Sequence, residues 1–219
     1  MNKEIIKHIN ITFVRHGTTE YNMQDRVQGS SDIPLSKKGI EDIENVHLTN
    51  SHYDVYLHSP LIRSKDTLFG ILMKYDIKSD NVNIVESKDI TERKYGIFEG
   101  LTKKEIQEKH SELYNEWMIN ENVQHESIET IENVIGRIHS FVSKLLSCEF
   151  NQILAVTHSG FLYALYKFMT NRPLHLKPDE IDISFPNCCI LDLDVTVYHS
   201  YIEFTLKIQN KEFKKKVMH

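Results

Sequence analysis

Near its start the chain reads Ile9-Asn10-Ile11-Thr12-Phe13-Val14-Arg15-His16-Gly17, a β-branched apolar run that passes directly into an arginine, a histidine and a glycine. Short apolar runs of this kind are typical of strands buried in a sheet. Two later stretches repeat the arrangement: Val55-Tyr56-Leu57 passes into His58-Ser59-Pro60, and Leu154-Ala155-Val156 passes into Thr157-His158-Ser159-Gly160. Because ligands bind outside the carboxyl ends of strands in open parallel sheets, these three strand ends predict one binding site.

Short apolar runs alternate with helical patterns along the chain. The helical pattern is clearest at 130–146, where apolar side chains recur at three- and four-residue intervals and so share one face. The alternation predicts a three-layer α/β/α sandwich with a mostly parallel central sheet. Strands are predicted at 9–14, 54–57, 83–85, 153–156, 189–195 and 201–208, and further helices at 36–46, 61–72 and 161–169.

Two polar segments differ from this pattern. Residues 102–123 are helical in pattern but very polar, which fits an insertion that partly covers a site and, equally well, a solvated pair of surface helices. No repeat or Pro/Gly-rich linker divides the chain, so we expect one domain spanning 1–219 with a helical cap insertion at about 94–128. The run Lys214-Lys215-Lys216 is expected to be a frayed, solvated tail.

The composition excludes several classes of protein. The chain has 219 residues, 40% of them apolar, and a formal net charge of −5, so it can bury one sizeable core and lacks the basic bias of nucleic-acid binders. Its three cysteines are odd in number and two are adjacent, which implies no disulfide framework. The first residues lack the apolar stretch of a signal peptide and no run approaches membrane-spanning length, so we expect neither feature. We expect a cytoplasmic protein without nucleic-acid or membrane partners.

The residue types at the predicted site point to phosphate. Arg15 and Arg63 carry planar guanidinium groups that pair bidentately with phosphate oxygens. Helices beginning near Ser59 and Ser159 would add backbone N–H donors. A histidine among such cations either donates a hydrogen bond to the phosphoryl group or attacks phosphorus as a neutral imidazole. A carboxylic acid is then needed to protonate the leaving oxygen, and Glu92 is placed for that role.

Each of these residues, taken alone, also has an ordinary structural explanation. Arg63 could lie on a helix surface, Glu92 is a weaker signal still, and His58 is expected to be a structural residue satisfied by the backbone. The strand ends that carry His16 and His158 differ, because a glycine closely follows each and lets the backbone approach a ligand. Together the set favours a site. The adjacent cysteines are expected to be buried, inert thiols, since no second pair stands at metal-ligand spacing.

With these residues the chain resembles the histidine phosphatase superfamily, in its phosphoglycerate-mutase-like branch. The resemblance begins with Arg15-His16-Gly17-Thr18-Thr19-Glu20-Tyr21-Asn22, a highly specific signature at a strand end. Further matching blocks follow in family order and span nearly the whole chain: Gln28-Gly29, Asp32, Pro34-Leu35, Gly39, Ser59-Pro60-Leu61, Arg63, Thr67, Glu92-Arg93, Gly96, Glu99-Gly100 and Thr157-His158-Ser159-Gly160.

The resemblance implies a role for each matching residue. His16 would be the phosphorylated nucleophile, and Glu92 would be the acid toward the leaving group and then the base toward water. His158 would stabilise charge that develops on the transferred group. The implied substrate- and phosphate-binding residues are Arg15, Thr18, Asn22, Gln28, Gly29, Arg63 and Ser159. The resemblance implies no metal ion or other cofactor, because the positive side chains take the place that magnesium has in other phosphoryl-transfer sites.

The family that the chain resembles contains both phosphatases and mutases. Cofactor-dependent mutases of this kind carry a long insertion with paired arginines, whereas here Glu92 and His158 are 66 positions apart (158 minus 92) and no arginine lies between Lys94 and Ile135. We therefore expect a broad-specificity phosphomonoesterase that hydrolyses small phosphorylated metabolites through a phosphohistidine. A cofactor-dependent phosphoglycerate mutase and a non-catalytic phosphate-binding protein remain alternatives. The physiological substrate and the oligomeric state stay open, a homodimer included.

Overall fold

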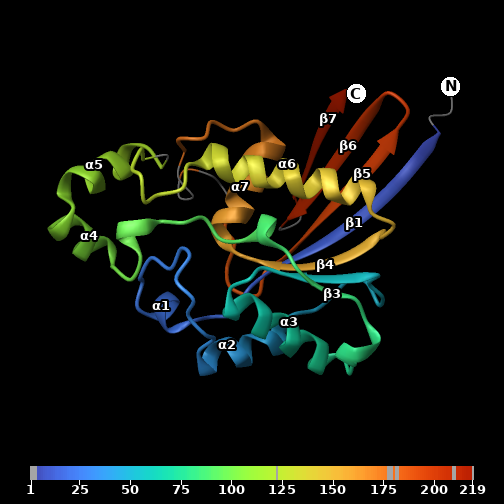
Figure 1. The fold of residues 1–219 in the computed structure, drawn as a ribbon, viewed down its shortest axis with the longest axis horizontal. Coiled ribbons are helices and arrows are strands. Elements are labelled where there is room, and N and C mark those ends of the chain that lie inside the picture. The colour runs from blue at the N-terminus through green and yellow to red at the C-terminus, as the bar shows by residue number, and fades with distance from the viewer. Residues whose placement is uncertain (1–3, 122, 177–179, 181–182, 209–210, 219) are drawn as a thin grey trace.

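The computed structural model describes residues 4–121, 123–176, 180, 183–208 and 211–218. Within these residues one mixed sheet of seven strands runs through the molecule in the order β3-β2-β4-β1-β5-β6-β7 (Figure 1). The strands are β1 (Ile5–Arg15), β2 (Val55–His58), β3 (Ile84–Glu86), β4 (Gln152–Thr157), β5 (Ile190–Tyr198), β6 (Tyr201–Ile208) and β7 (Lys211–Met218).

The centre of the sheet is parallel and one side of it is antiparallel. Strands β1, β2, β3 and β4 run parallel to one another, whereas β5, β6 and β7 form an antiparallel extension beside β1. The register pairs Arg15 at the end of β1 with Thr157 at the end of β4. The carboxyl ends of the first and the last parallel strand in the chain therefore lie next to each other.

Helices cover both faces of the sheet. On one face lie α6 (Ile131–Ser147) and α7 (Ser159–Thr170), and on the other lie α2 (Lys37–Asp42), a short 3-10 helix at Ile43–Asn45 and α3 (Ile62–Lys74) (Figure 1). The expected three-layer architecture is confirmed. The remaining helical elements are α1 (Glu20–Met23), α4 (Lys103–Lys109), α5 (Ser111–Ile119) and 3-10 helices at Ser79–Asn81, Lys88–Ile90 and Gly96–Phe98.

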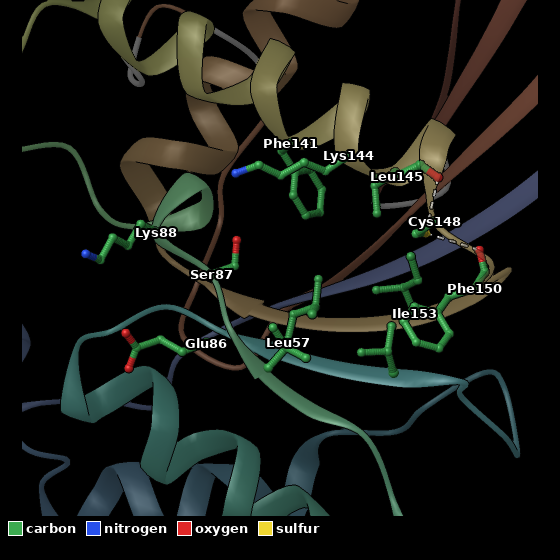
Figure 2. A pocket seen from close by; sticks show the side chains of 12 residues that line it. Leu57, Glu86, Ser87, Lys88, Phe141, Lys144, Leu145, Cys148, Phe150 and Ile153 are labelled. Carbon is green, nitrogen blue, oxygen red and sulfur yellow. Dashed lines mark hydrogen bonds between the residues drawn. The ribbon is translucent and has the colours of Figure 1, made fainter.

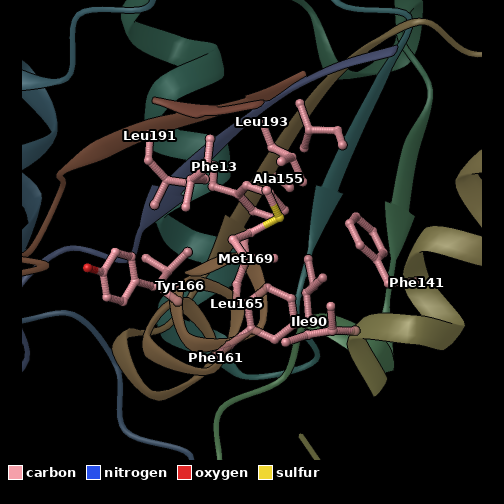
Figure 3. Close-up of a cluster of buried hydrophobic side chains, with 14 of the residues drawn as sticks. Phe13, Ile90, Phe141, Ala155, Phe161, Leu165, Tyr166, Met169, Leu191 and Leu193 are labelled. Carbon is pink, nitrogen blue, oxygen red and sulfur yellow. The ribbon is translucent and has the colours of Figure 1, made fainter. Parts of the chain in front are cut away.

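Two apolar clusters hold the layers together, one on each face of the sheet. In the larger cluster Phe13 of β1 lies 5.9 Å from the ring of Phe141 on α6 and 6.0 Å from that of Phe161 on α7 (ring centroids; Figure 3). In the smaller cluster the buried residues of α3 pack beneath β2 and β4. Because side chains alternate between the two faces along each strand, the continuous apolar run of β4 contributes to both clusters.

The prediction of a frayed C-terminal tail is wrong. Residues 214–216 lie in β7, which pairs with β6 from the Tyr201↔Met218 pair to the Ile208↔Lys211 pair. Lys215 points to the helical layer, where its Nζ donates to the carbonyl of Phe168 at 2.6 Å. Lysines are common on edge strands because their charge discourages further pairing, and here their number concealed the strand.

The polar segment at 102–123, predicted to be helical, forms the two helices α4 and α5. It packs around a small apolar cluster of its own, whose buried members are Phe98, Ile106, Val123 and Ile128. None of the residues of α5, all of which the structure describes, is fully buried. The pair is therefore half solvated, with one face anchored on the small cluster.

An apolar cavity of about 480 Å³ lies between α6 and the β2–β3 side of the sheet (Figure 2). Leu57, Phe141 and Ile153 line its interior, and Lys88 and Lys144 stand at its rim. None of its lining residues belongs to the predicted binding site. In the described part of the chain no helix has both the length and the apolar character needed to cross a membrane.

Candidate active site

His16 and His158 meet at the adjacent ends of β1 and β4. The backbone N–H of His16 donates to the carbonyl of Thr157 at 3.0 Å, which continues the parallel pairing one residue beyond β1. The two imidazole centroids are 5.1 Å apart, and both side chains are buried. Two histidines that are 142 positions apart in sequence (158 minus 16) thus form the floor of one site.

The hydrogen bond of His16 fixes which ring nitrogen carries the proton. Nδ1 lies 2.7 Å from the carbonyl oxygen of Gly17, and a carbonyl can only accept, so Nδ1 is the protonated nitrogen. In the neutral ring the lone pair then resides on Nε2. Burial, and then the positive charges of Arg63 and Arg15, lower the pKa of His16 well below its usual value. The ring is therefore neutral near pH 7 and has the tautomer of a nitrogen nucleophile.

Arg63 enters the site from the first turn of α3 and is fully buried. Its Nη1 donates to the carbonyl of Ser31 at 2.7 Å and its Nη2 to the carbonyl of Gly29 at 2.8 Å. Burial lowers the pKa of Arg63 to about 10, against the opposing attraction of Glu92 and Asp32. The guanidinium stays charged at neutral pH and is held by backbone dipoles.

Three buried polar atoms at this site have no hydrogen-bond partner among the described residues: Arg15 Nε, Arg63 Nε and His158 Nδ1. Arg15 Nη1 donates to the carbonyl of Phe185 at 2.5 Å, and burial lowers the pKa of Arg15. Buried polar atoms are nearly always satisfied, so an unsatisfied group needs an explanation. Three of them on two arginines and a histidine fit a site shaped for an anion.

Ser59 orients the ring of His158. The Ser59 hydroxyl lies 2.5 Å from His158 Nε2, and it also accepts the N–H of Leu61 at 3.3 Å. A hydroxyl can donate to Nε2 or accept from it; when it donates, the imidazole proton lies on Nδ1, the unsatisfied atom. Burial, and then the charges of Arg63, His16 and Arg15, lower the pKa of His158 well below its usual value. His158 is thus a neutral ring, and in the tautomer with the proton on Nδ1 it offers a hydrogen-bond donor.

The carboxylate of Glu92, which comes from the segment after β3, lies at the N-terminus of α7. Its Oε1 accepts the N–H groups of Arg93 at 2.8 Å and Phe161 at 3.2 Å, and its Oε2 accepts that of Gly160 at 3.2 Å. A Cβ at Gly160 would stand 2.4 Å from Oε1, so the glycine makes room for the carboxylate. Glu92 opposes the lowering of the pKa values of both Arg15 and Arg63, which places its charge close to them.

The remaining predicted residues are only partly brought together. Asn22 Oδ1 accepts the N–H of Thr19 at 3.1 Å, and Gln28 Oε1 accepts the Thr19 hydroxyl at 2.9 Å. Thr18 is engaged elsewhere, because its hydroxyl donates to Asp42 of α2 at 2.5 Å. Gly29 contributes the carbonyl that Arg63 binds, and half-buried Ser159 is the first residue of α7.

Two further residues support the site and were not predicted as site residues, although Glu99 belongs to one of the matching sequence blocks. Asn187 Nδ2 donates to the carbonyl of His16 at 2.9 Å and to Asn22 Oδ1 at 3.3 Å, and nothing in its local sequence indicates this. The Glu99 carboxylate accepts the N–H groups of Ser30 and Tyr95, both at 2.9 Å. These bonds outweigh burial, which acts in the opposite sense, and lower the pKa of Glu99. Glu99 thereby fixes the loop whose carbonyls hold Arg63.

The other histidine that follows a predicted strand lies outside this cluster of contacts. His58 Nδ1 lies 2.8 Å from the carbonyl of Ser59, so the prediction of a structural histidine satisfied by backbone is confirmed. Across the described residues there is no group of three or more His, Cys, Asp or Glu side chains that could hold a metal ion.

Known proteins resemble this chain in both sequence and fold. Phosphoserine phosphatase 1 of Hydrogenobacter thermophilus is 26% identical over 162 residues, which cover 72% of this chain and 74% of that protein. A 2,3-bisphosphoglycerate-dependent phosphoglycerate mutase of Cytophaga hutchinsonii is 29% identical over 177 residues, which cover 78% and 80%. The solved structure of Bacillus stearothermophilus YhfR superposes with a TM-score of 0.76 at 19% identity and covers 93% of this chain and 97% of that one.

Residues 11–205 match the histidine phosphatase superfamily, branch 1. This range contains the strand-end histidines, both arginines and Glu92, and it extends into β6. The resemblance noted in the sequence is confirmed, and the chain belongs to the histidine phosphatase superfamily.

Proposed function

We propose that this protein is a phosphomonoesterase that transfers the phosphoryl group of a small phosphorylated metabolite to His16 and then to water. One observation carries the proposal: a neutral imidazole with its lone pair on Nε2 lies among three buried polar atoms that lack a partner in the described residues. A phosphate dianion would satisfy these atoms and neutralise Arg15 and Arg63. A site organised in this way would hold the phosphate next to the nucleophile, His16.

The proposed reaction has two displacements. In the first, His16 Nε2 attacks phosphorus, the P–O bond to the leaving group breaks, and protonated Glu92 gives its proton to the leaving oxygen. In the second, the Glu92 carboxylate takes a proton from water as the hydroxyl attacks phosphorus, and the N–P bond breaks. Arg15, Arg63 and His158 stabilise the charge on the equatorial oxygens throughout. The proposal routes no step through a metal ion.

The sequence around the site favours water as the acceptor. The segment between Lys94 and Ile135 has no arginine to bind the carboxylate of a phosphoglycerate. We place the cap insertion at about 94–128, where Glu99 joins it to the loop that holds Arg63. Relatives of this chain carry the names of both phosphatases and mutases, so the mutase stays as the second candidate. A non-catalytic role is less favoured because nucleophile, arginines and acid are all present.

The test of the proposal is hydrolysis of p-nitrophenyl phosphate in the presence of EDTA. We expect turnover in the native protein and a loss of at least about 1,000-fold in the His16→Ala variant, as for removal of other catalytic nucleophiles. The matched control is His199→Ala, which changes an exposed histidine paired with Glu4. Acid-labile phosphate should be trapped on His16 during turnover. Hydrolysis without such a label would overturn the proposal.

A second assay separates hydrolysis from mutase activity. The protein is incubated with 3-phosphoglycerate and 2,3-bisphosphoglycerate, and both 2-phosphoglycerate and free phosphate are measured. We expect free phosphate to accumulate. Rapid formation of 2-phosphoglycerate with little free phosphate would select the mutase instead.

A further inference from the structure

Three charged side chains from distant parts of the chain meet in the interior beside Glu92. Arg93, Glu121 and Lys167 are only 0%, 4% and 1% exposed. The Glu121 carboxylate lies between the two cations: Oε1 is 3.5 Å from Arg93 Nη1 and Oε2 is 2.5 Å from Lys167 Nζ. We call these three residues the buried triad.

Backbone groups fix every member of the buried triad. Arg93 donates from Nη2 to the carbonyl of Glu121 at 3.0 Å and from Nε to the carbonyl of Glu129 at 2.7 Å. Lys167 Nζ donates to the carbonyl of Leu174 at 3.1 Å. The backbone N–H of Glu121 donates to the carbonyl of His175 at 3.1 Å. The guanidinium of Arg93 therefore has a single defined position.

The buried triad is connected to Glu92 by one peptide bond. The Arg93 N–H donates to Glu92 Oε1, while Gly160 and Phe161 at the start of α7 donate to the same carboxylate. Lys167 stands seven residues after Gly160 and hence two turns further along the same face of α7. Helix α7 thus holds the Glu92–Arg93 dipeptide at two points, directly through its N-terminus and indirectly through Lys167 and Glu121.

Stability alone is a weak explanation for this arrangement. Taking three charges out of water is expensive, and apolar residues of similar volume often replace buried ion pairs without loss of stability. What directional contacts supply, and apolar packing does not, is a fixed orientation. The residue whose orientation they fix is the neighbour of Glu92.

We propose that Glu121 is a positioning residue that, through Arg93, sets the orientation in which Glu92 gives its proton to the leaving oxygen. The inference rests on the proposed function, in which Glu92 is the acid. Glu121 also follows α5, so the same contact ties the end of the cap insertion to the acid. Loss of the Glu121 charge should leave His16, Arg15 and Arg63 in place and should misalign Glu92.

The effect of Glu121 should depend on the leaving group. A good leaving group departs with little protonation, whereas a poor one requires it. We expect Glu121→Gln to lower kcat for phenyl phosphate by roughly 10- to 100-fold, within the range that general acid catalysis contributes. On p-nitrophenyl phosphate the same variant should lose less than about 3-fold, because that leaving group needs little proton assistance. KM should stay close to that of the native protein for both substrates.

Two variants frame this measurement. Glu92→Gln is the reference and should show the same leaving-group pattern with a larger loss. Glu105→Gln is the matched control, because Glu105 also lies in the cap insertion and pairs with an arginine, Arg26, but not with Arg93. It should leave both rates unchanged. If Glu92→Gln itself slows both substrates equally, the assignment of the acid fails; if only Glu121→Gln does so, the positioning role fails.

A folding defect is separated from a positioning defect by a triple variant, Arg93→Met, Glu121→Leu and Lys167→Met. It removes all three charges together and so leaves no uncompensated charge in the interior. We expect a cooperative thermal transition and the same selective loss on phenyl phosphate. The inference would be overturned if this variant lost activity on both substrates by the same factor relative to the native protein, or if it failed to fold. The triad would then serve the fold rather than Glu92.

Discussion

Two pairs of buried cations, Arg15 with Arg63 and Arg93 with Lys167, differ in their surroundings. Arg15 and Arg63 make hydrogen bonds to backbone carbonyls, pair with no carboxylate among the described residues and leave both Nε atoms unsatisfied. Arg93 and Lys167 share the Glu121 carboxylate and fill their remaining donors with carbonyls. Arg15 and Arg63 therefore have free donors and positive charge to offer to an anion, whereas Arg93 and Lys167 already have a carboxylate partner within the protein.

The difference has an energetic meaning. Burial lowers the pKa values of Arg15 and Arg63, and the charge of Glu92 opposes this only in part. The lowered values reflect a free-energy cost of keeping these two charges inside the folded protein. A bound phosphate would return that energy as affinity and as stabilisation of the transition state. The buried triad instead fixes the orientation of the Glu92–Arg93 segment. Variants of the two pairs of cations should therefore differ in their effects on activity and on stability.

The largest effect is expected for Arg63→Met measured as activity. Loss of one preorganised cation should lower kcat/KM on p-nitrophenyl phosphate by roughly 100- to 1,000-fold. The free energy of unfolding should change by less than about 1 kcal/mol, because the apolar side chain also removes an unpaired buried charge. The control is Arg172→Ala, an exposed arginine at the end of α7, which should be silent in both measurements. Equal activity of the two variants would contradict the site.

Arg93→Met should lower the stability of the protein and leave its phosphate affinity unchanged, the reverse of Arg63→Met. The change leaves Glu121 with Lys167 alone and removes the bonds to the carbonyls of Glu121 and Glu129. We expect a loss of about 3 kcal/mol in the free energy of unfolding, measured in urea, because the two carbonyl groups stay buried without their donors. Phosphate affinity should stay near that of the native protein. A variant as stable as the native protein would show that the bonds from Arg93 to these carbonyls do not contribute to stability.

Inorganic phosphate should stabilise the native protein and not Arg63→Met. At a phosphate concentration of 100 times Kd, linkage predicts about 2.7 kcal/mol of added stability. The melting temperature of the native protein and of Arg93→Met should therefore rise with phosphate, while chloride at equal ionic strength should have little effect. A rise of the same size in Arg63→Met would place the bound anion elsewhere.

The last prediction concerns pH, and each histidine contributes less than the effects above. Burial and the nearby arginines lower the pKa values of His16 and His158 in the folded state, so below about pH 6.5 the unfolded chain binds more protons than the folded one. Stability must then fall as the pH drops below 6.5, by about 1.4 kcal/mol for each histidine at pH 5.5. The double variant His16→Asn, His158→Gln should lose this part of the slope in urea unfolding. An unchanged slope would mean that both rings are readily protonated in the folded state.

The sequence alone predicted the elements that depend on local patterns. The β-branched runs became β1 and β4, and the apolar periodicity at 130–146 became α6. It also indicated that the strand ends carrying His16 and His158 lie together, because parallel strands align their carboxyl ends. Strand β7 escaped prediction, since its lysines conceal an alternation that becomes visible only against β6 and α7.

What only the tertiary structure decided are the contacts between distant segments. In the sequence Glu121 belongs to a polar stretch and Lys167 to an otherwise apolar helix, so neither indicates that they bind each other beneath Arg93. The same holds for Asn187 and Glu99, whose partners lie in other loops. Local sequence determines strands, helices and the chemistry available at their ends, because those depend on neighbours in the chain. Which buried charges are paired and which are left for a ligand depends on how the layers pack, and that is fixed only when the whole chain has folded.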